Sequence, residues 1–106
     1  MALYINKNYN KEEQLWMINI AGEIDIYTAN QLKETLMKML DEHNENIKIN
    51  CLELDYIDST GLGVLIGALK RLKKENKSII IINPKKNISK LLTITGLNKI
   101  FIIEGE

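Results

Sequence analysis

Residues 47–63 of the chain read IKINCLELDYIDSTGLG, and this stretch decides the fold. In its first part, isoleucine and cysteine alternate with lysine and asparagine, and this period of two predicts a strand that runs from Ile47 towards Leu54. Its last part opens a segment from Thr60 to Asn76 that reads as a helix. A strand followed directly by a helix is a building unit of α/β sheets, so the stretch predicts an α/β domain.

The segments before this stretch predict a hairpin and a first helix. Residues 3–8 and 14–20 alternate between apolar and polar side chains, and residues 10–12 between them suit a hairpin turn. From Thr28 to about His43 the apolar residues recur at helical intervals instead. The sequence Thr28-Ala-Asn-Gln31 has the spacing of a capping box, which predicts that this helix begins there.

The segments after it complete the pattern. Residues 78–83 contain four consecutive isoleucines, which predict a strand covered on both faces. A short helix is expected from about Asn87 until Gly96 ends it, and residues 100–103 predict a last strand. The complete order, β-β-α-β-α-β-α-β, predicts a mixed, partly parallel sheet whose crossovers are helices.

Length and composition describe one ordinary globular domain. The 106 residues suit a single domain, which we predict to span residues 1–106. The 14 basic and 14 acidic side chains balance, which argues against a general nucleic-acid or anionic-membrane binder. The two signs are segregated, however, because residues 1–69 hold 5 basic and 11 acidic side chains, whereas residues 70–106 hold 9 and 3.

Several absences narrow the cellular context. The single cysteine, Cys51, cannot form an internal disulfide or a thiolate metal site, and it is expected in the core with Met37 and Met39. No signal-peptide pattern is visible, and the longest apolar stretch, residues 62–69, is far shorter than the ~20 residues of a membrane span. We therefore expect a cytoplasmic protein that does not bind membranes.

The candidate site is Asp58-Ser59-Thr60-Gly61-Leu62-Gly63, at the junction of a strand and a helix. Ligands of α/β sheets bind outside the carboxyl ends of the strands, and a helix N-terminus offers free N–H groups to an anion such as phosphate. Gly61 and Gly63 leave the backbone accessible there. In a purely structural interpretation, Ser59 or Thr60 is only the N-cap, Asp58 helps to cap, and the glycines ease helix–sheet packing.

Motifs of enzymes do not fit the chain. A serine-hydrolase elbow requires glycine where Ile57 stands, and no P-loop sequence is present. The spacing of Gly61, Gly63 and Gly67 departs from the dinucleotide fingerprint by one residue. The only histidine, His43, lies at a predicted helix end, where a solvated residue is more usual than a general base. No metal-ligand spacing occurs, so we expect no active site, no cofactor and no metal.

A second loop, residues 22–28, follows the second predicted strand. Its acids Glu23 and Asp25 are common at helix N-termini for structural reasons alone. If this loop lies beside the first, however, Asp25 and Asp58 form an acidic rim around the Ser59 hydroxyl.

A basic run marks the end of the second predicted helix and continues beyond it. Nucleic-acid binding is one interpretation, but no aromatic residue lies between Tyr56 and Phe101 to stack on bases. A solvated helix end is the interpretation that we favour, because cations complement the negative end of the helix dipole. The residues concerned are Lys70, Arg71, Lys73, Lys74, Lys77, Lys85, Lys86 and Lys90.

Together these motifs resemble the STAS-domain anti-sigma factor antagonists, especially those of the bacterial general-stress sigma factor. The resemblance covers nearly the whole chain and includes AGEIDIY at residues 21–27, IDSTGLGV at 57–64 and ITGL at 94–97. Two departures are small and leave the main motif intact. The turn at residues 75–77 lacks the glycine pair often seen there, and Leu91-Leu92 stands where Leu-Phe is common.

The resemblance implies a partner switch. The unphosphorylated chain would bind an anti-sigma factor that is also a serine kinase and so free its sigma factor. That kinase would phosphorylate Ser59 with ATP, with Thr60 as the nearest competing acceptor, and a PP2C-type phosphatase would reverse the reaction. The chain would be a substrate and no enzyme, and a monomer when free. The implied partner-binding residues are Glu23, Asp25, Asp58, Ser59, Thr60, Gly61 and Gly63.

Two alternatives remain open at this point. The helix start at Gly61 and Gly63 could bind phosphate or a nucleotide directly. The chain could also be a STAS subunit of a larger stress-sensing complex, which differs only in the identity of the partner.

Overall fold

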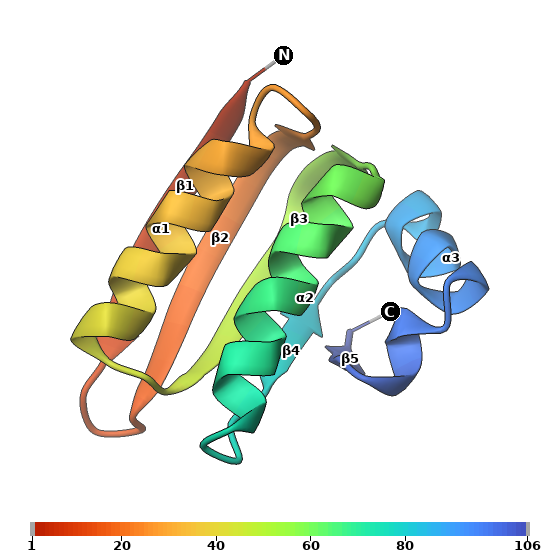
Figure 1. Cartoon of the computed structure of the whole chain (residues 1–106). Coiled ribbons are helices and arrows are strands. Elements are labelled where there is room, and N and C mark those ends of the chain that lie inside the picture. Colours follow the sequence, from red (N-terminus) through yellow and green to blue (C-terminus); the bar gives the residue numbers. More distant parts are fainter. Residues whose placement is uncertain (1, 106) are drawn as a thin grey trace.

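Three helices lie on one face of a five-stranded sheet (Figure 1). The computed structural model describes residues 2–105. The predicted order is confirmed, with a short 3-10 helix, η1, added after the third α-helix. The strands are β1 (Leu3–Asn10), β2 (Leu15–Ile24), β3 (Asn46–Ile57), β4 (Ile79–Ile82) and β5 (Ile102–Glu104). The helices are α1 (Ala29–Glu42), α2 (Ser59–Lys73), α3 (Lys86–Ile94) and η1 (Leu97–Lys99).

The strands lie in the sheet in the order in which they occur along the chain. β1 and β2 form an antiparallel hairpin, and every later neighbour pair is parallel. Each helical crossover therefore moves one strand further in the same direction, and right-handed crossovers of this kind place all the helices on one face. As a result, the carboxyl ends of β2, β3 and β4 and the N-terminal ends of the helices that follow them lie at the same edge of the sheet (Figure 1).

The core fills the space between the sheet and the helices. Alternate residues of the central strands point towards the helices and are fully buried, as the period of two requires. The largest side chains that are fully buried are Ile18, Ile20, Ile24, Leu32, Leu36, Met39, Leu40, Ile47, Ile49, Leu54, Leu72 and Ile79. Met39 and Cys51 are buried as predicted, whereas Met37 packs at the margin and is partly buried.

The prediction that residues 78–83 are covered on both faces is wrong. Ile79 and Ile81 are buried beneath the helices, but Ile80 and Ile82 alternate with them and are only partly buried. They lie on the face of the sheet that none of the three α-helices covers (Figure 1). A continuous isoleucine run is thus compatible with a strand that packs fully on one side.

The predicted capping box at Thr28 is also wrong. The Thr28 hydroxyl donates a hydrogen bond back to the carbonyl of Glu23 at 2.8 Å, and it makes no side-chain cap bond to α1. The side chain of Gln31 donates instead to the carbonyl of Leu3 at 3.0 Å. Glu23 lies five residues before Thr28 and Leu3 lies on β1, so neither partner is the one that the capping-box spacing predicts, although Thr28 does stand at the N-cap position of α1.

Candidate functional site

The two loops singled out in the sequence lie side by side. β2 and β3 pair in parallel up to Ile24 and Ile57, their last residues. One step further, the backbone N–H of Asp58 donates to the carbonyl of Ile24 at 3.2 Å. The adjacency that the sequence left open is therefore present, and both loops leave the sheet at the edge where α1 and α2 begin (Figure 1).

Asp58, rather than Ser59 or Thr60, is the N-cap of α2. Its backbone is extended, with φ −107° and ψ −173°, and its Oδ1 accepts a hydrogen bond from the Gly61 N–H at 3.1 Å. Ser59 is the first helical residue, and its exposed hydroxyl makes no hydrogen bond to any other residue in 2–105. Capping thus does not engage this hydroxyl: the structural interpretation drawn from the sequence was right that Asp58 caps the helix and wrong that Ser59 or Thr60 is the N-cap.

The glycines Gly61 and Gly63 serve different purposes. A Cβ on Gly61 would lie 2.5 Å from Cγ2 of Ile24 and 2.8 Å from Cγ1 of Ile57, so only glycine lets α2 pack this closely on the sheet. A Cβ on Gly63 would have no atom within 4 Å, and the same holds for Gly67. Packing within the chain therefore explains Gly61 but leaves Gly63 and Gly67 unexplained.

Asp25 does not form an exposed acidic rim. The side chain is buried, with 5% of the residue exposed, and its Oδ1 accepts from the N–H groups of Tyr27 at 2.8 Å and Thr28 at 3.1 Å. Asp25 therefore organises the loop that leads into α1, as aspartate commonly does in turns. Glu23 is half-buried in the last part of β2, where it pairs with Tyr56 of β3. Of the two predicted rim acids, only Asp58 reaches the surface.

Three large apolar side chains near the site were not predicted from the sequence. Ile26 and Tyr27 are 64% and 80% exposed in the loop before α1, and Tyr56 is 44% exposed near the end of β3. Apolar residues in a short loop are a recognisable signal, because loops are usually polar and a cluster of exposed apolar residues marks a contact surface. The sequence reasoning concentrated on the acids of this loop and so missed them.

Two grooves flank the first turn of α2. The α3 groove lies between the β3–α2 junction and α3, and it is lined by Tyr56, Ile57, Asp58, Ser59, Leu62, Asn87, Ile88, Leu91 and Thr95. The α1–α2 groove lies between the first two helices, and it is lined by Lys33, Met37, Thr60, Gly63, Val64, Gly67 and Ala68. Ser59 and Thr60 thus open onto different grooves, and the two unexplained glycines form part of the second.

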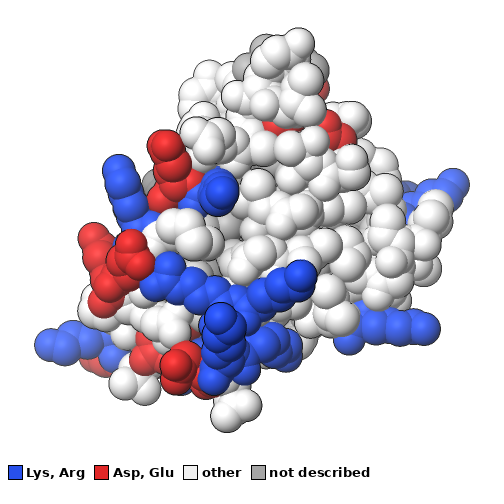
Figure 2. Space-filling view, viewed as in Figure 1, with Lys and Arg blue, Asp and Glu red and all other residues white. Residues whose placement is uncertain are grey.

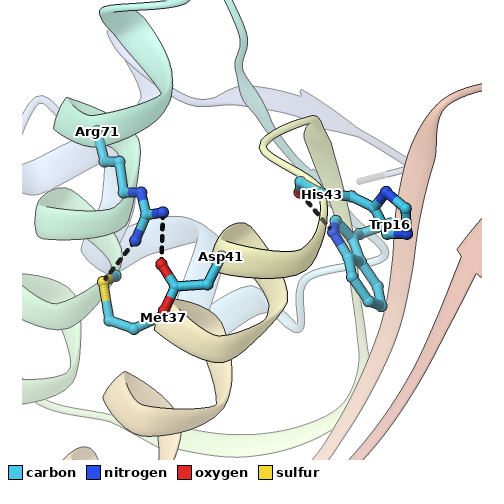
Figure 3. Close-up of polar contacts among 5 residues, drawn as sticks. All are labelled: Trp16, Met37, Asp41, His43 and Arg71. Carbon is cyan, nitrogen blue, oxygen red and sulfur yellow. Dashed lines mark hydrogen bonds and ion pairs between the residues drawn. The ribbon is translucent and has the colours of Figure 1, made fainter.

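The first part of the basic run gathers over the C-terminal end of α2, away from Ser59 (Figure 2), whereas Lys85, Lys86 and Lys90 lie at the start of α3 or within it. Arg71 pairs with Asp41 of α1 at 2.7 Å, and the Arg71 guanidinium also contacts the sulfur of Met37 (Figure 3). Lys77 pairs with Glu45 at 2.7 Å, and Lys85 pairs with Asp55. Part of the run therefore ties α2 and the loops to neighbouring elements.

His43 and Cys51 take no part in the site. His43 follows the C-terminal end of α1, at the far end of the helix layer from Ser59 (Figure 1). Its ring stacks on Tyr9 with centroids 3.7 Å apart, and its carbonyl accepts from the indole N–H of Trp16 at 2.9 Å (Figure 3). Burial raises the pKa of the Cys51 thiol to about 12, so this thiol is protonated near neutral pH.

Residues 2–105 contain no group of three or more histidine, cysteine, aspartate or glutamate side chains that could hold a metal ion. Within the same part of the chain, no helix is long and apolar enough to cross a membrane.

Comparisons with known proteins identify the family. The family model described as STAS domain matches residues 6–105. The anti-sigma-B factor antagonist of Bacillus subtilis is 38% identical over 102 residues, covering 96% of this chain and 93% of that protein. The solved structure of the unphosphorylated anti-sigma factor antagonist SpoIIAA has a TM-score of 0.81 at 20% identity, covering 97% of this chain and 90% of that chain. Phosphorylated SpoIIAA from Bacillus gives 0.73 at 20% identity, covering 97% and 93%.

The family that the motifs suggested is thereby confirmed by independent means. The family model extends over all the strands and helices from β1 to β5 except the first residues of β1. The structural likeness to SpoIIAA extends over the same fold. The chain therefore belongs to the STAS domain family, and its relatives there include the anti-sigma-B factor antagonist of Bacillus subtilis.

Proposed function

We propose that the chain is an anti-sigma factor antagonist whose partner binds at the N-terminal end of α2, and that phosphorylation of Ser59 prevents this binding. One observation carries the proposal more than any other. The Ser59 hydroxyl is exposed on the first turn of a helix that Asp58 already caps, so the hydroxyl has no structural task. A serine in this position can gain or lose a phosphate without disturbing the fold.

Two features near the N-terminal half of α2 support partner binding at this end. Ile26, Tyr27 and Tyr56 expose apolar surface, and tyrosine is among the residues most enriched in interfaces. Gly63 and Gly67 keep the α1–α2 groove open although no contact inside the chain requires glycine there. A glycine on an exposed helix face costs about 0.5–1 kcal/mol relative to alanine, so a close-fitting partner would explain its presence.

The phosphate would act by local electrostatics. A phosphoserine carries about −1.5 to −2 charge near neutral pH. The N-terminal end of α2 can accept that charge within the chain, because its unpaired N–H groups and helix dipole favour an anion. A partner that packs against the same surface would meet a bulky dianion next to the Asp58 carboxylate. A loss of only ~1.4 kcal/mol of binding free energy lowers affinity tenfold, so no global rearrangement is required.

In the proposed cycle of phosphorylation and dephosphorylation, the chain is the substrate. In the forward step a kinase transfers the γ-phosphoryl group of ATP to the Ser59 oxygen. The Oγ–P bond forms, the bond to the bridging oxygen of ADP breaks, and the hydroxyl proton is lost. In the reverse step a PP2C-type phosphatase hydrolyses the phosphoserine. The kinase is proposed to be the anti-sigma factor itself, so that binding and modification concern the same surface.

Thr60 and direct binding at the helix start are the competing possibilities. Thr60 is exposed as well, but it lines the α1–α2 groove, whereas Ser59 lines the α3 groove with Asp58. The two hydroxyls therefore lie on different sides of α2, and the preference for Ser59 over Thr60 rests on the resemblance to the antagonist family. Direct binding of free phosphate or nucleotide at the helix start is disfavoured, because the Gly61 N–H already donates to Asp58; a free anion, unlike a phosphate attached covalently to Ser59, would have to bind beside that carboxylate through the remaining N–H groups alone.

The phosphate acceptor can be mapped directly. The full chain, Ser59→Ala and Thr60→Ala are each incubated with ATP and the anti-sigma kinase of the same organism, and the phosphopeptides are sequenced by mass spectrometry. We expect one phosphate on the unaltered chain and on Thr60→Ala, at Ser59 in both, and none on Ser59→Ala. Phosphate on Thr60 of the unaltered chain, or on Ser59→Ala, would refute the assignment.

A further inference from the structure

A third groove, with a distinctive lining, lies beside the C-terminal half of α2. It is lined by Ile66, Leu69, Lys70 and Lys73 of α2, by the C-cap residue Lys74, and by Ile100, which follows η1 on the other side. We term it the lysine groove. Its uncharged lining is entirely aliphatic, with Leu69 buried, Ile66 partly buried and Ile100 42% exposed.

The helical period explains why these side chains share one face. Ile66, Lys70 and Lys73 are separated by four and three residues, and Leu69 and Lys73 by four, so they follow one another along one side of α2. The apolar members point towards the sheet and Ile100. The lysines keep their ammonium groups in water while their aliphatic stems extend along the apolar floor, as long cationic side chains commonly do.

The charges of the lysine groove are not neutralised by the chain. Among residues 2–105, Lys70, Lys73 and Lys74 form no ion pair, and the one polar contact of Lys73 is a hydrogen bond to the Ser78 hydroxyl at 3.3 Å. By contrast, Arg71 and Lys77 from the same run are paired with carboxylates. Figure 2 shows the resulting concentration of positive charge over this end of α2. The three lysines thus leave a positive rim around an aliphatic floor.

A positive rim around an aliphatic floor indicates which kind of molecule the lysine groove would bind. Nucleic acid is disfavoured because the lining offers no aromatic ring for base stacking. A lipid surface is disfavoured because the apolar residues form the floor of a groove, whereas membrane-binding surfaces insert projecting apolar side chains. A ridge of apolar side chains flanked by carboxylates complements both the floor and the rim, and an amphipathic helix presents such a ridge.

We propose that the lysine groove docks an acidic amphipathic helix of a partner protein. Ser59 and Lys70 are about 16 Å apart along the axis of α2, so this surface is separate from the proposed phosphorylation site. The inference rests on the groove alone and does not depend on the proposed function. Two partners could occupy the two ends of α2 at once.

The probe for this inference is a synthetic 18-residue peptide with leucines at three- and four-residue spacing and glutamates on both flanks. It is titrated into the ¹⁵N-labelled full chain, and amide shifts are followed by NMR. We expect saturable shifts centred on residues 66–74 and on Ile100, which weaken as salt is raised. A scrambled peptide of the same composition should give none. Shifts centred elsewhere, or none at millimolar peptide, would overturn the proposal.

Variants separate the contributions that the lysine charges and the aliphatic floor make to peptide binding. Lys70→Glu with Lys74→Glu should weaken peptide binding at least tenfold, and Ile100→Ser should weaken it without changing the salt dependence. The matched control is Lys7→Glu with Lys11→Glu, two exposed lysines of the hairpin, and it should change affinity less than twofold. Circular dichroism checks that each variant is folded. Equal affinity of the first variant and the control would contradict the proposal.

Two further measurements distinguish the alternatives. Vesicles of phosphatidylglycerol and phosphatidylcholine should not bind the chain, and binding to them without binding to the peptide would assign the groove to membranes. Ser59→Asp should leave the peptide affinity unchanged, so a failure of the proposed phosphorylation switch and a failure of this inference give different results.

Discussion

The carboxylate of Asp58 accepts a hydrogen bond from the backbone N–H of Gly61 at 3.1 Å, and this contact caps α2. Because Asp58 fills the role of N-cap, the adjacent Ser59 is free of structural duty. At this strand-to-helix junction, helix capping and the presentation of a free hydroxyl are therefore carried out by two different residues. One residue holds the helix start in place, and its neighbour presents a hydroxyl to solvent.

Removal of the cap should cost stability, whereas removal of the hydroxyl should not. Asp58→Ala should lower the free energy of unfolding by about 1 kcal/mol, the usual cost of losing an N-cap. Ser59→Ala should change it by less than about 0.5 kcal/mol, as exposed substitutions typically do. Urea unfolding measures both. A loss at Ser59→Ala as large as that at Asp58→Ala would mean that Ser59 has a structural role.

The two glycines of the first turns should respond oppositely to alanine. Gly61→Ala should destabilise the fold by about 1–3 kcal/mol, because its Cβ would lie 2.5 Å from Ile24. Gly63→Ala should stabilise the fold by about 0.5–1 kcal/mol, since nothing opposes the new methyl group and alanine favours a helix. Thermal unfolding distinguishes them. If Gly63→Ala is stable but binds the anti-sigma factor less tightly, the partner contacts the helix at Gly63. Unchanged affinity would show that Gly63 lies outside the interface.

Tyr27 should contribute to binding and not to folding. At 80% exposure it loses little packing when truncated, but an aromatic residue at the centre of an interface can contribute 2 kcal/mol or more. Tyr27→Ala should therefore weaken binding to the anti-sigma factor at least tenfold, as measured by calorimetry. The control is Tyr4→Ala, which removes another exposed tyrosine, located on β1. Equal effects of the two changes would argue against a specific interface at the loop before α1.

The Cys51 thiol should make stability fall at high pH. Burial raises its pKa in the folded chain from 9.0 to about 12, so between these values the unfolded chain binds fewer protons than the folded one. The contribution is fully present below pH 9 and is lost as pH rises towards 12. Cys51→Ala should show a shallower fall in the free energy of unfolding over this range. Identical slopes for the two proteins would show that the thiol is not the group responsible.

The sequence patterns predicted the type of every strand and α-helix, because the fold buries one face of each strand and one stripe of each α-helix; the short 3-10 helix η1 was not predicted. What failed depended on how a loop turns or on contacts with another strand, neither of which a local pattern shows. Thr28 bonds to Glu23 and Gln31 to Leu3, so the spacing of a capping box was misleading. The isoleucine run of β4 did not reveal which face lacks a helix, because that follows from the handedness shared by the crossovers.

The candidate site was predictable in place but not in detail. The strand-to-helix junction and the neighbouring loop were found because parallel strands align their carboxyl ends. Asp58 is the N-cap because its backbone is extended, and Ser59 is not because it is already helical. Aspartate and serine can adopt either backbone, so the sequence does not show which of the two caps α2. The burial of Asp25 and the exposure of Tyr27 depend on how one loop turns, and both residue types occur in either setting.

Phosphate on Ser59 is proposed to weaken the binding of the anti-sigma factor enough to act as a switch. The most direct test is calorimetric titration of the anti-sigma factor with the unmodified chain and with the same chain phosphorylated at Ser59. Both proteins should show the same far-UV circular dichroism, since the helix start can accept the charge. We predict that phosphorylation weakens the affinity at least tenfold. Equal affinities for two equally folded chains would contradict the account.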